Sequence, residues 1–205
     1  MTDASCTQTD RLELLRELFA SATHDASAAM CRWTEGLITV TLDEVQEIPL
    51  EDVASELKIG DELLTMVVLA LQGEVGGNMI LVFDETNGRQ LAASLLGRQP
   101  GTDPQWSELE ISALTETGNI LGCAYMNALT RLIDTELFPS APYFIQDYGI
   151  SVLQQALMAQ AMTGDDLLIC RIGFRRKTQE LDWRVIFVPN QGMRQALEGA
   201  LHSAA

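Results

Sequence analysis

Apolar residues recur every three or four positions in two long stretches of the sequence, and this spacing predicts two long helices. The first helix begins at Thr9 or Asp10, either of which can cap it, and runs to about Glu35. The second begins at Ser107, has acidic residues in its first turn, and runs to about Arg131. The positions expected to be buried are Leu12, Leu15, Phe19, Ala22, Ala26, Ala29, Met30 and Trp33 in the first helix, and Leu109, Ala113, Ile120, Ala124 and Leu132 in the second.

Alternating, β-branched segments follow each predicted long helix and indicate strands. We expect strands at residues 37–48, 63–71, 78–83, 166–175 and 181–188, and an extended segment at 143–149. Shorter helices are expected at residues 49–57, 84–96, 151–162 and 190–202, and residues 97–105 form the clearest linker-like break.

The order of these elements occurs twice along the chain, which indicates an internal duplication. Residues 15–17 (Leu-Arg-Glu) align with residues 114–116 (Leu-Thr-Glu) at an offset of 99. Residues 80–96 align with residues 185–201 at an offset of 105, with an Arg-Gln pair at equivalent positions.

Charge and cysteine content narrow the function classes. The chain has 205 residues and a net charge of −16, which argues against nucleic acid and anionic membrane as partners. The negative charge is compatible with a partner that has a basic face. The other interpretation is that the charge only keeps the protein soluble. The four cysteines are scattered without a Cys-x-x-Cys pair, so we expect free thiols, no zinc site and a cytoplasmic location. No apolar run reaches transmembrane length, and no signal-peptide pattern is present.

Three polar residues share one face of the second long helix. Ser112, Glu116 and Asn119 are spaced by four and then three residues, so they are neighbours on the helix surface. Pro142 follows, which gives the pattern Ser-x3-Glu-x2-Asn-x22-Pro. This pattern resembles, position for position, the active-site signature of the CheC/CheX/FliY family of bacterial chemotaxis phosphatases.

The resemblance implies an α+β fold, a pseudo-twofold duplicated CheC-like domain in which two long helices pack on an antiparallel sheet. We expect a single domain over residues 1–205, with a flexible tail at 1–8, a first half-repeat at 9–97 and a second, motif-bearing half-repeat at 106–205. Each half alone has too few strands to bury its long helix.

Many CheC proteins carry the signature in both halves. Here the duplication places Glu13, Glu17, Ala20 and Asp43 at the corresponding first-half positions. The acid is kept at Glu17, but an alanine cannot orient a water molecule. We therefore expect one active site, in the second half.

The resemblance also implies a reaction, the hydrolysis of the aspartyl phosphate of a CheY-like response regulator. The regulator supplies Mg²⁺ and a lysine, so no cofactor and no metal ligand are expected from this chain. Asn119 would position the attacking water, because a neutral amide both donates and accepts hydrogen bonds. Glu116 would pair with the regulator's lysine, and Ser112 and Pro142 would contact the partner and shape the adjoining loop.

Each signature residue also has a structural interpretation. Glu116 and Ser112 could be ordinary surface residues, and Pro142 could mark the start of a strand. Gly118 and a second glycine four residues later could allow a close helix–helix contact, although that does not explain Asn119. The alternative function is a non-catalytic interaction module of chemotaxis or the flagellar switch that binds phosphorylated CheY or a CheD-like deamidase. A CheD-like protein is also a candidate partner of the enzyme.

Overall fold

The computed structural model describes residues 8–49, 52, 55, 63–101, 103–149, 151, 166–176 and 179–204. The helices are α1 (Gln8–Trp33), α3 (Glu85–Leu95), α4 (Glu108–Ile133) and α6 (Gln191–Ala204). The strands are β1 (Thr39–Pro49), β2 (Leu63–Gln72), β3 (Gly77–Asp84), β4 (Phe138–Pro139), β5 (Tyr143–Tyr148), β6 (Asp166–Arg176) and β7 (Gln179–Pro189).

The seven strands form one antiparallel sheet in the order β1-β6-β7-β3-β2-β4, and β5 also pairs with β2. β4 and β5 lie one after the other along the same edge of β2, because the other edge of β2 is taken by β3. Strands from the two halves of the chain therefore pair at three places in the sheet: β1 with β6, β7 with β3, and β2 with β4 and β5.

The strand order has a twofold pseudo-symmetry about the central β3–β7 pair. If β2 is exchanged with β6, β3 with β7, and β1 with the β4–β5 edge, the result is the same strand order read from the opposite edge of the sheet. An offset of 99 carries residues 39–49 of β1 onto residues 138–148, the span from the start of β4 to the end of β5. The same offset aligns the sequences of the two long helices, so the pseudo-twofold α+β fold expected from the resemblance is confirmed.

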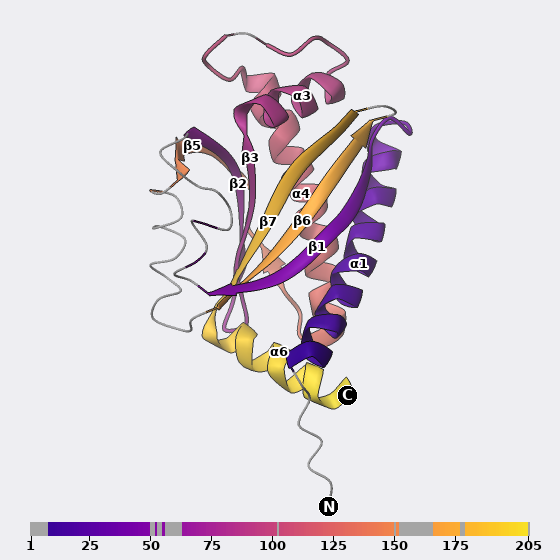
Figure 1. Ribbon diagram of the computed structural model, residues 1–205, viewed down its shortest axis with the longest axis vertical. Coiled ribbons are helices and arrows are strands. Elements are labelled where there is room, and N and C mark those ends of the chain that lie inside the picture. Colours follow the sequence, from indigo (N-terminus) through magenta and orange to yellow (C-terminus); the bar gives the residue numbers. More distant parts are fainter. Residues whose placement is uncertain are drawn as a thin grey trace, which may run out of the picture.

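Both long helices cover one face of the curled sheet, with α3 at one end of the molecule and α6 across the other (Figure 1). The main apolar core lies between the helices and this face and includes Val67 and Leu69 of β2, Phe83 of β3, and Trp183 and Phe187 of β7. The rings of Phe83 and Trp183 are stacked with centroids 4.0 Å apart. Each large apolar side chain buried there stabilises the fold by roughly 1.5–3 kcal/mol.

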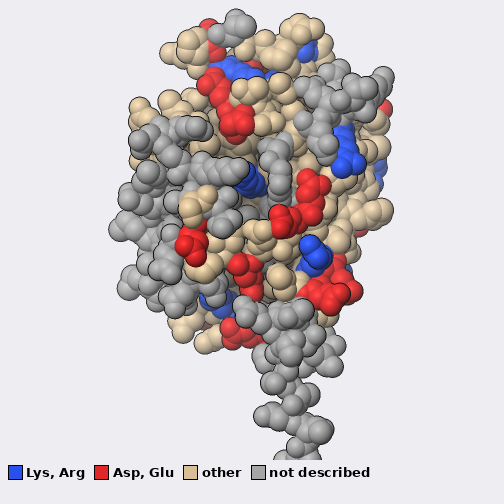
Figure 2. Space-filling model, viewed as in Figure 1, with Lys and Arg blue, Asp and Glu red and all other residues tan. Residues whose placement is uncertain are grey.

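The opposite side of the molecule faces the viewer in Figure 2. In the described part of this side, acidic side chains are distributed over the surface with arginines between them, rather than gathered in one patch. The net charge of −16 is thus not concentrated in one place on this side.

Two predicted core positions are wrong. Leu109, in the first turn of α4, is 63% exposed, and Trp33, the last residue of α1, is 42% exposed. In the first turn of α4 the buried position belongs to Glu110, which the apolar pattern could not indicate. The helices expected at residues 49–57 and 151–162, and the tail at 1–8, lie almost wholly outside the described residues. The two-residue β4 was not predicted, since it is too short to show alternation.

Candidate functional site

The motif helix α4 begins with a capping box. The Ser107 side chain accepts a hydrogen bond from the backbone N–H of Glu110, and the Glu110 carboxylate accepts one from the backbone N–H of Ser107 at 2.9 Å. The Ser107 hydroxyl also donates to Oε2 of Glu110 at 2.7 Å. A cap of this kind stabilises a helix start by about 1 kcal/mol.

A buried arginine joins the start of α4 to α3. Arg89 is 5% exposed, and its Nη1 lies 3.2 Å from Oε2 of Glu110, which is 2% exposed. The guanidinium also donates to the backbone carbonyls of residues 103–105 and lies 4.0 Å from the ring centroid of Trp106. The side chain of Arg89 therefore holds residues 103–106, the segment that leads into α4.

The charge state of Glu110 reflects these contacts. Burial alone would raise the pKa of Glu110, but hydrogen bonds from Ser107 and the charges of Arg89 and Arg98 outweigh it, so the pKa lies below the ordinary value. The carboxylate is thus ionised at neutral pH and forms a buried ion pair with Arg89.

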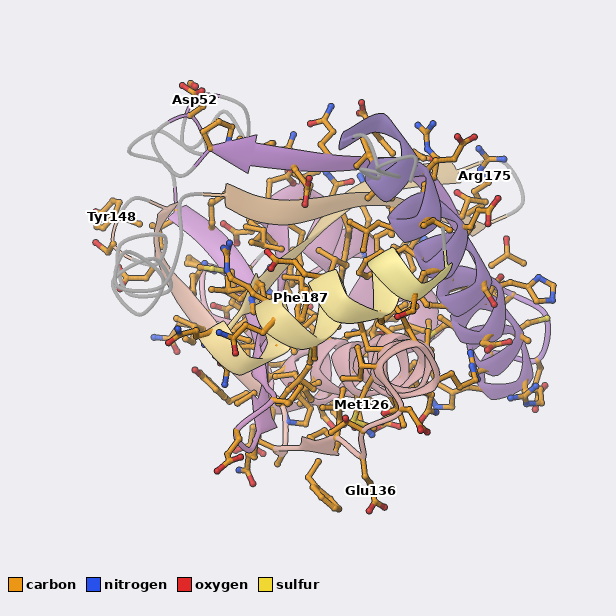
Figure 3. All side chains as sticks on the ribbon, turned by 90° about the horizontal axis from the view of Figure 1, so that it is seen from below. Asp52, Met126, Glu136, Tyr148, Arg175 and Phe187 are labelled. Carbon is orange, nitrogen blue, oxygen red and sulfur yellow. The ribbon has the colours of Figure 1, made fainter. Side chains whose placement is uncertain are left out.

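The three helical signature residues lie on the outer face of α4. Ser112 and Glu116 are exposed and Asn119 is half-buried. Met126 of the same helix, labelled in Figure 3, lies seven residues after Asn119 and packs half-buried against the core. Ser112 and Glu116 therefore lie where a partner can reach them, and Asn119 lies at the border between this exposed face and the core.

The inner face of α4 lies against β2 through two glycines. A Cβ atom on Gly118 would overlap the side chain of Val67, and one on Gly122 would lie 2.5 Å from Cδ2 of Leu69. The close approach that these glycines permit is to a strand, so the interpretation as a helix–helix contact is wrong. The distance between α4 and β2, which the two glycines keep short, therefore also determines how far the turn that carries Asn119 lies from the sheet.

Pro142 lies between β4 and β5, which both pair with β2. Phe144 of β5 pairs with Val67, and the same register brings Pro142 to the level of Leu69. Val67 and Leu69 are the residues beneath the two glycines that flank Asn119, and α4 contacts both β4 and β5. The register, continued by one residue, therefore predicts that Pro142 lies near the helical turn that carries Asn119.

The first half has a corresponding arrangement with different side chains. Glu13, Glu17 and Ala20 are all exposed on α1. Asp43, the counterpart of Pro142, lies at the irregularity in the β1–β6 ladder between Leu42 and Glu44. Both edge strands are thus interrupted at equivalent positions, but the first half presents a methyl group where the second presents the Asn119 amide. That the first half lacks activity stays a prediction.

A cysteine lies next to Asn119 on the outer face. The Cys123 thiol is 3.7 Å from Oδ1 of Asn119 and donates to it. Cys31 and Cys123 are free thiols, as expected, and both are half-buried.

The described part of the chain contains neither a cluster of metal ligands nor a membrane-spanning helix. There, no three His, Cys, Asp or Glu side chains come together in a way that could hold a metal ion. No described helix combines the length and apolarity that crossing a membrane requires. The expectation that this chain brings no metal of its own stays a prediction.

The fold places the chain among the FliY and FliM middle-domain structures. FliY from Thermotoga maritima superposes with a TM-score of 0.77 at 13% identity, covering 97% of this chain and 99% of that one. The FliM middle domain from H. pylori gives 0.68 at 12% identity, covering 94% and 99%. No protein-family profile matches the sequence.

At the level of sequence, the chain is 22% identical over 196 residues to the CheY-P phosphatase CheC of Bacillus subtilis (strain 168), and the match covers 94% of each chain. This match and the shared fold confirm the resemblance to the CheC/CheX/FliY family that the signature indicates.

Sequence reasoning missed the contacts that support the signature. Arg89 aligns with Arg194 in the duplication, which indicated a repeat but not the ion pair with Glu110. The capping-box spacing from Ser107 to Glu110 could have been read from the sequence. The position of Cys123 four residues after Asn119 also placed it on the same face, but spacing alone does not indicate the contact between the two side chains.

Proposed function

We propose that this protein is a phosphatase that hydrolyses the aspartyl phosphate of a CheY-like response regulator through a single site on the outer face of α4. The observation that carries the proposal is the outer face of α4, on which Ser112 and Glu116 are exposed and Asn119 follows one turn later. The similarity to CheC of Bacillus subtilis over nearly the whole chain supports it. The substrate is a cytoplasmic signalling protein, so the proposal includes a cytoplasmic location.

The chemistry asks little of this chain beyond positioning. An acyl phosphate is already labile, and the regulator contributes the phosphorylated aspartate, Mg²⁺ and lysine. What the regulator lacks is a water molecule held in line with the phosphorus, and Asn119 holds that water in place. Its carbonyl accepts from the water and its NH₂ donates, without a negative charge that would repel the phosphoryl group.

Glu116 orients the complex in this mechanism. It lies one helical turn before Asn119 and is exposed, so its carboxylate can reach a lysine of the docked regulator. Ser112, a further turn back, contacts the partner, and Pro142 shapes the adjoining edge of the site. The net charge of −16 adds a general attraction for a basic face of the partner.

The second candidate is a non-catalytic interaction module. It is favoured by the fold match to FliM from H. pylori, because one of the matching structures is a complex of FliM with FliG. In that case the face of α4 would bind phosphorylated CheY, or a CheD-like deamidase, without chemistry. The intact second-half signature favours the phosphatase.

Phosphate release separates the two functions. A Mg²⁺-loaded, acetyl-phosphate-treated CheY from the same organism is assayed with the wild-type protein, Asn119→Ala, and the matched control Asn127→Ala, an exposed asparagine farther along α4. We expect Asn119→Ala to lose about 100-fold in rate, since it removes the group that positions the water. Asn127→Ala and Glu17→Ala should retain the wild-type rate. Full activity in Asn119→Ala would refute the mechanism.

A substitution of Glu116 tests the orienting role. Glu116→Ala should raise the regulator concentration needed for half-maximal rate, because it removes a pairing with the regulator's lysine. An unchanged half-maximal concentration together with an unchanged maximal rate would exclude this role.

A further inference from the structure

Cys123 lies one helical turn beyond Asn119 on the outer face of α4. Its Sγ is 3.7 Å from Oδ1 of Asn119, within the range for a hydrogen bond to the large sulfur atom. Both side chains are half-buried, so the contact is partly shielded from water. Glu116, Asn119 and Cys123 follow one another at spacings of three and four residues and form one continuous row.

The local charges keep this thiol protonated. Burial raises the pKa of Cys123, and the negative charge of Glu116 raises it further. The sulfur at neutral pH therefore carries its hydrogen and acts as a donor, so the hydrogen bond runs from S–H to the amide oxygen. A thiol held in this form is a poor nucleophile, which argues against a reactive or redox role for Cys123.

The amide of Asn119 needs such a neighbour. The last torsion of an asparagine side chain is broad, so an unsupported amide samples many orientations. A donor that holds Oδ1 narrows this range and sets where Nδ2 points. The oxygen has two acceptor positions, so it can take a hydrogen bond from Cys123 and still accept one from water.

We propose that Cys123 is a positioning residue that orients the Asn119 amide for its part in the reaction. Its kinetic effect rests on the proposed phosphatase function, whereas its effect on the orientation of the amide does not. Cys123 acts through Asn119 and does not itself touch the substrate.

Kinetics on three variants test this role. Cys123→Ala should lower kcat about three- to tenfold, equivalent to about 0.6–1.4 kcal/mol, with KM within about twofold of the wild type. Cys123→Ser keeps a donor at this position and should recover at least half of the lost rate. Cys31→Ala, which removes the half-buried free thiol of α1, should have no effect. An unchanged kcat in Cys123→Ala, or no recovery in Cys123→Ser, would overturn the proposal.

A measurement without activity separates this inference from the proposed function. The side-chain NH₂ resonances of Asn119 can be assigned by their loss in Asn119→Ala. We expect them to shift or broaden in Cys123→Ala and to stay in place in Cys31→Ala. If the wild-type protein shows no phosphatase activity, the proposed function fails while this spectrum still decides the positioning. Resonances identical in the wild type and Cys123→Ala would overturn it.

Discussion

The two glycines beneath the motif turn determine how closely α4 can lie on the sheet. Replacing Gly118 by alanine adds a Cβ atom that overlaps Val67 and lies 3.2 Å from its Cβ. Val67 is fully buried and β-branched, so its side chain cannot turn aside. Overpacking of this kind costs about 1–3 kcal/mol. Alanine also gains about 1 kcal/mol over glycine in a helix, which offsets part of that cost.

A control glycine separates the two effects. Gly199 lies in α6 and a Cβ there would meet nothing within 4 Å, so Gly199→Ala should stabilise the protein by about 0.5–1 kcal/mol. The difference between the two variants isolates the steric cost. Gly122→Ala should fall between them, because the atom it meets is the end of the more flexible Leu69 side chain.

Urea unfolding followed by far-ultraviolet circular dichroism measures these differences in the free energy of unfolding. We expect Gly118→Ala to unfold at a lower urea concentration than the wild type, and Gly199→Ala at a higher one. If Gly118→Ala gained as much stability as Gly199→Ala, α4 would not lie against β2 at the depth described, and the placement of Asn119 and Pro142 in one site would lose its basis.

Three further predictions concern the supports of α4. Ser107→Ala removes the N-cap and should lower the free energy of unfolding by about 1–2 kcal/mol in urea titrations, whereas an unchanged value would exclude the capping box. Glu110→Gln breaks a buried ion pair and should cost about 3 kcal/mol at pH 7. The pKa of Glu110 is lowered in the folded protein, so the ionised carboxylate stabilises the fold above its ordinary pKa, and that stability is lost as the pH falls through the lowered value. The difference between wild type and Glu110→Gln should therefore shrink between pH 7 and pH 3 in thermal unfolding, and a constant difference would contradict the assignment. Arg131→Ala should change stability by less than about 0.5 kcal/mol, because its ion pair with Asp25 is exposed on both sides.

Much of the fold was readable from the sequence because its signals are local. Apolar residues alternate in the segments that form strands and recur every three or four positions in the segments that form helices. The offset of 99 predicted the relation between the long helices. That offset also relates β1 to the β4–β5 edge, although β4 itself was not predicted. Leu109 was misplaced because the buried position in the first turn of α4 is taken by the polar residue Glu110.

The site was predictable in its residues but not in its supports. The spacing of Ser112, Glu116 and Asn119 indicated one helix face, which the structure shows to be the outer one. The expected position of Pro142 depends on the pairing of β5 with β2, a long-range register that no local pattern encodes. The hydrogen bond from Cys123 likewise depends on side-chain orientation, which the sequence does not specify.

The central claim is that one face of α4 accelerates hydrolysis of a regulator's aspartyl phosphate by means of Asn119. The most direct test follows the loss of phosphate from a Mg²⁺-loaded, phosphorylated CheY-like regulator as the concentration of this protein is raised to saturation. The account predicts that the rate rises to a plateau with the wild-type protein. With Asn119→Ala the midpoint should stay within about twofold, while the plateau falls to near the regulator's own rate. Saturable binding without acceleration by the wild-type protein, or an equal plateau for Asn119→Ala, would contradict it.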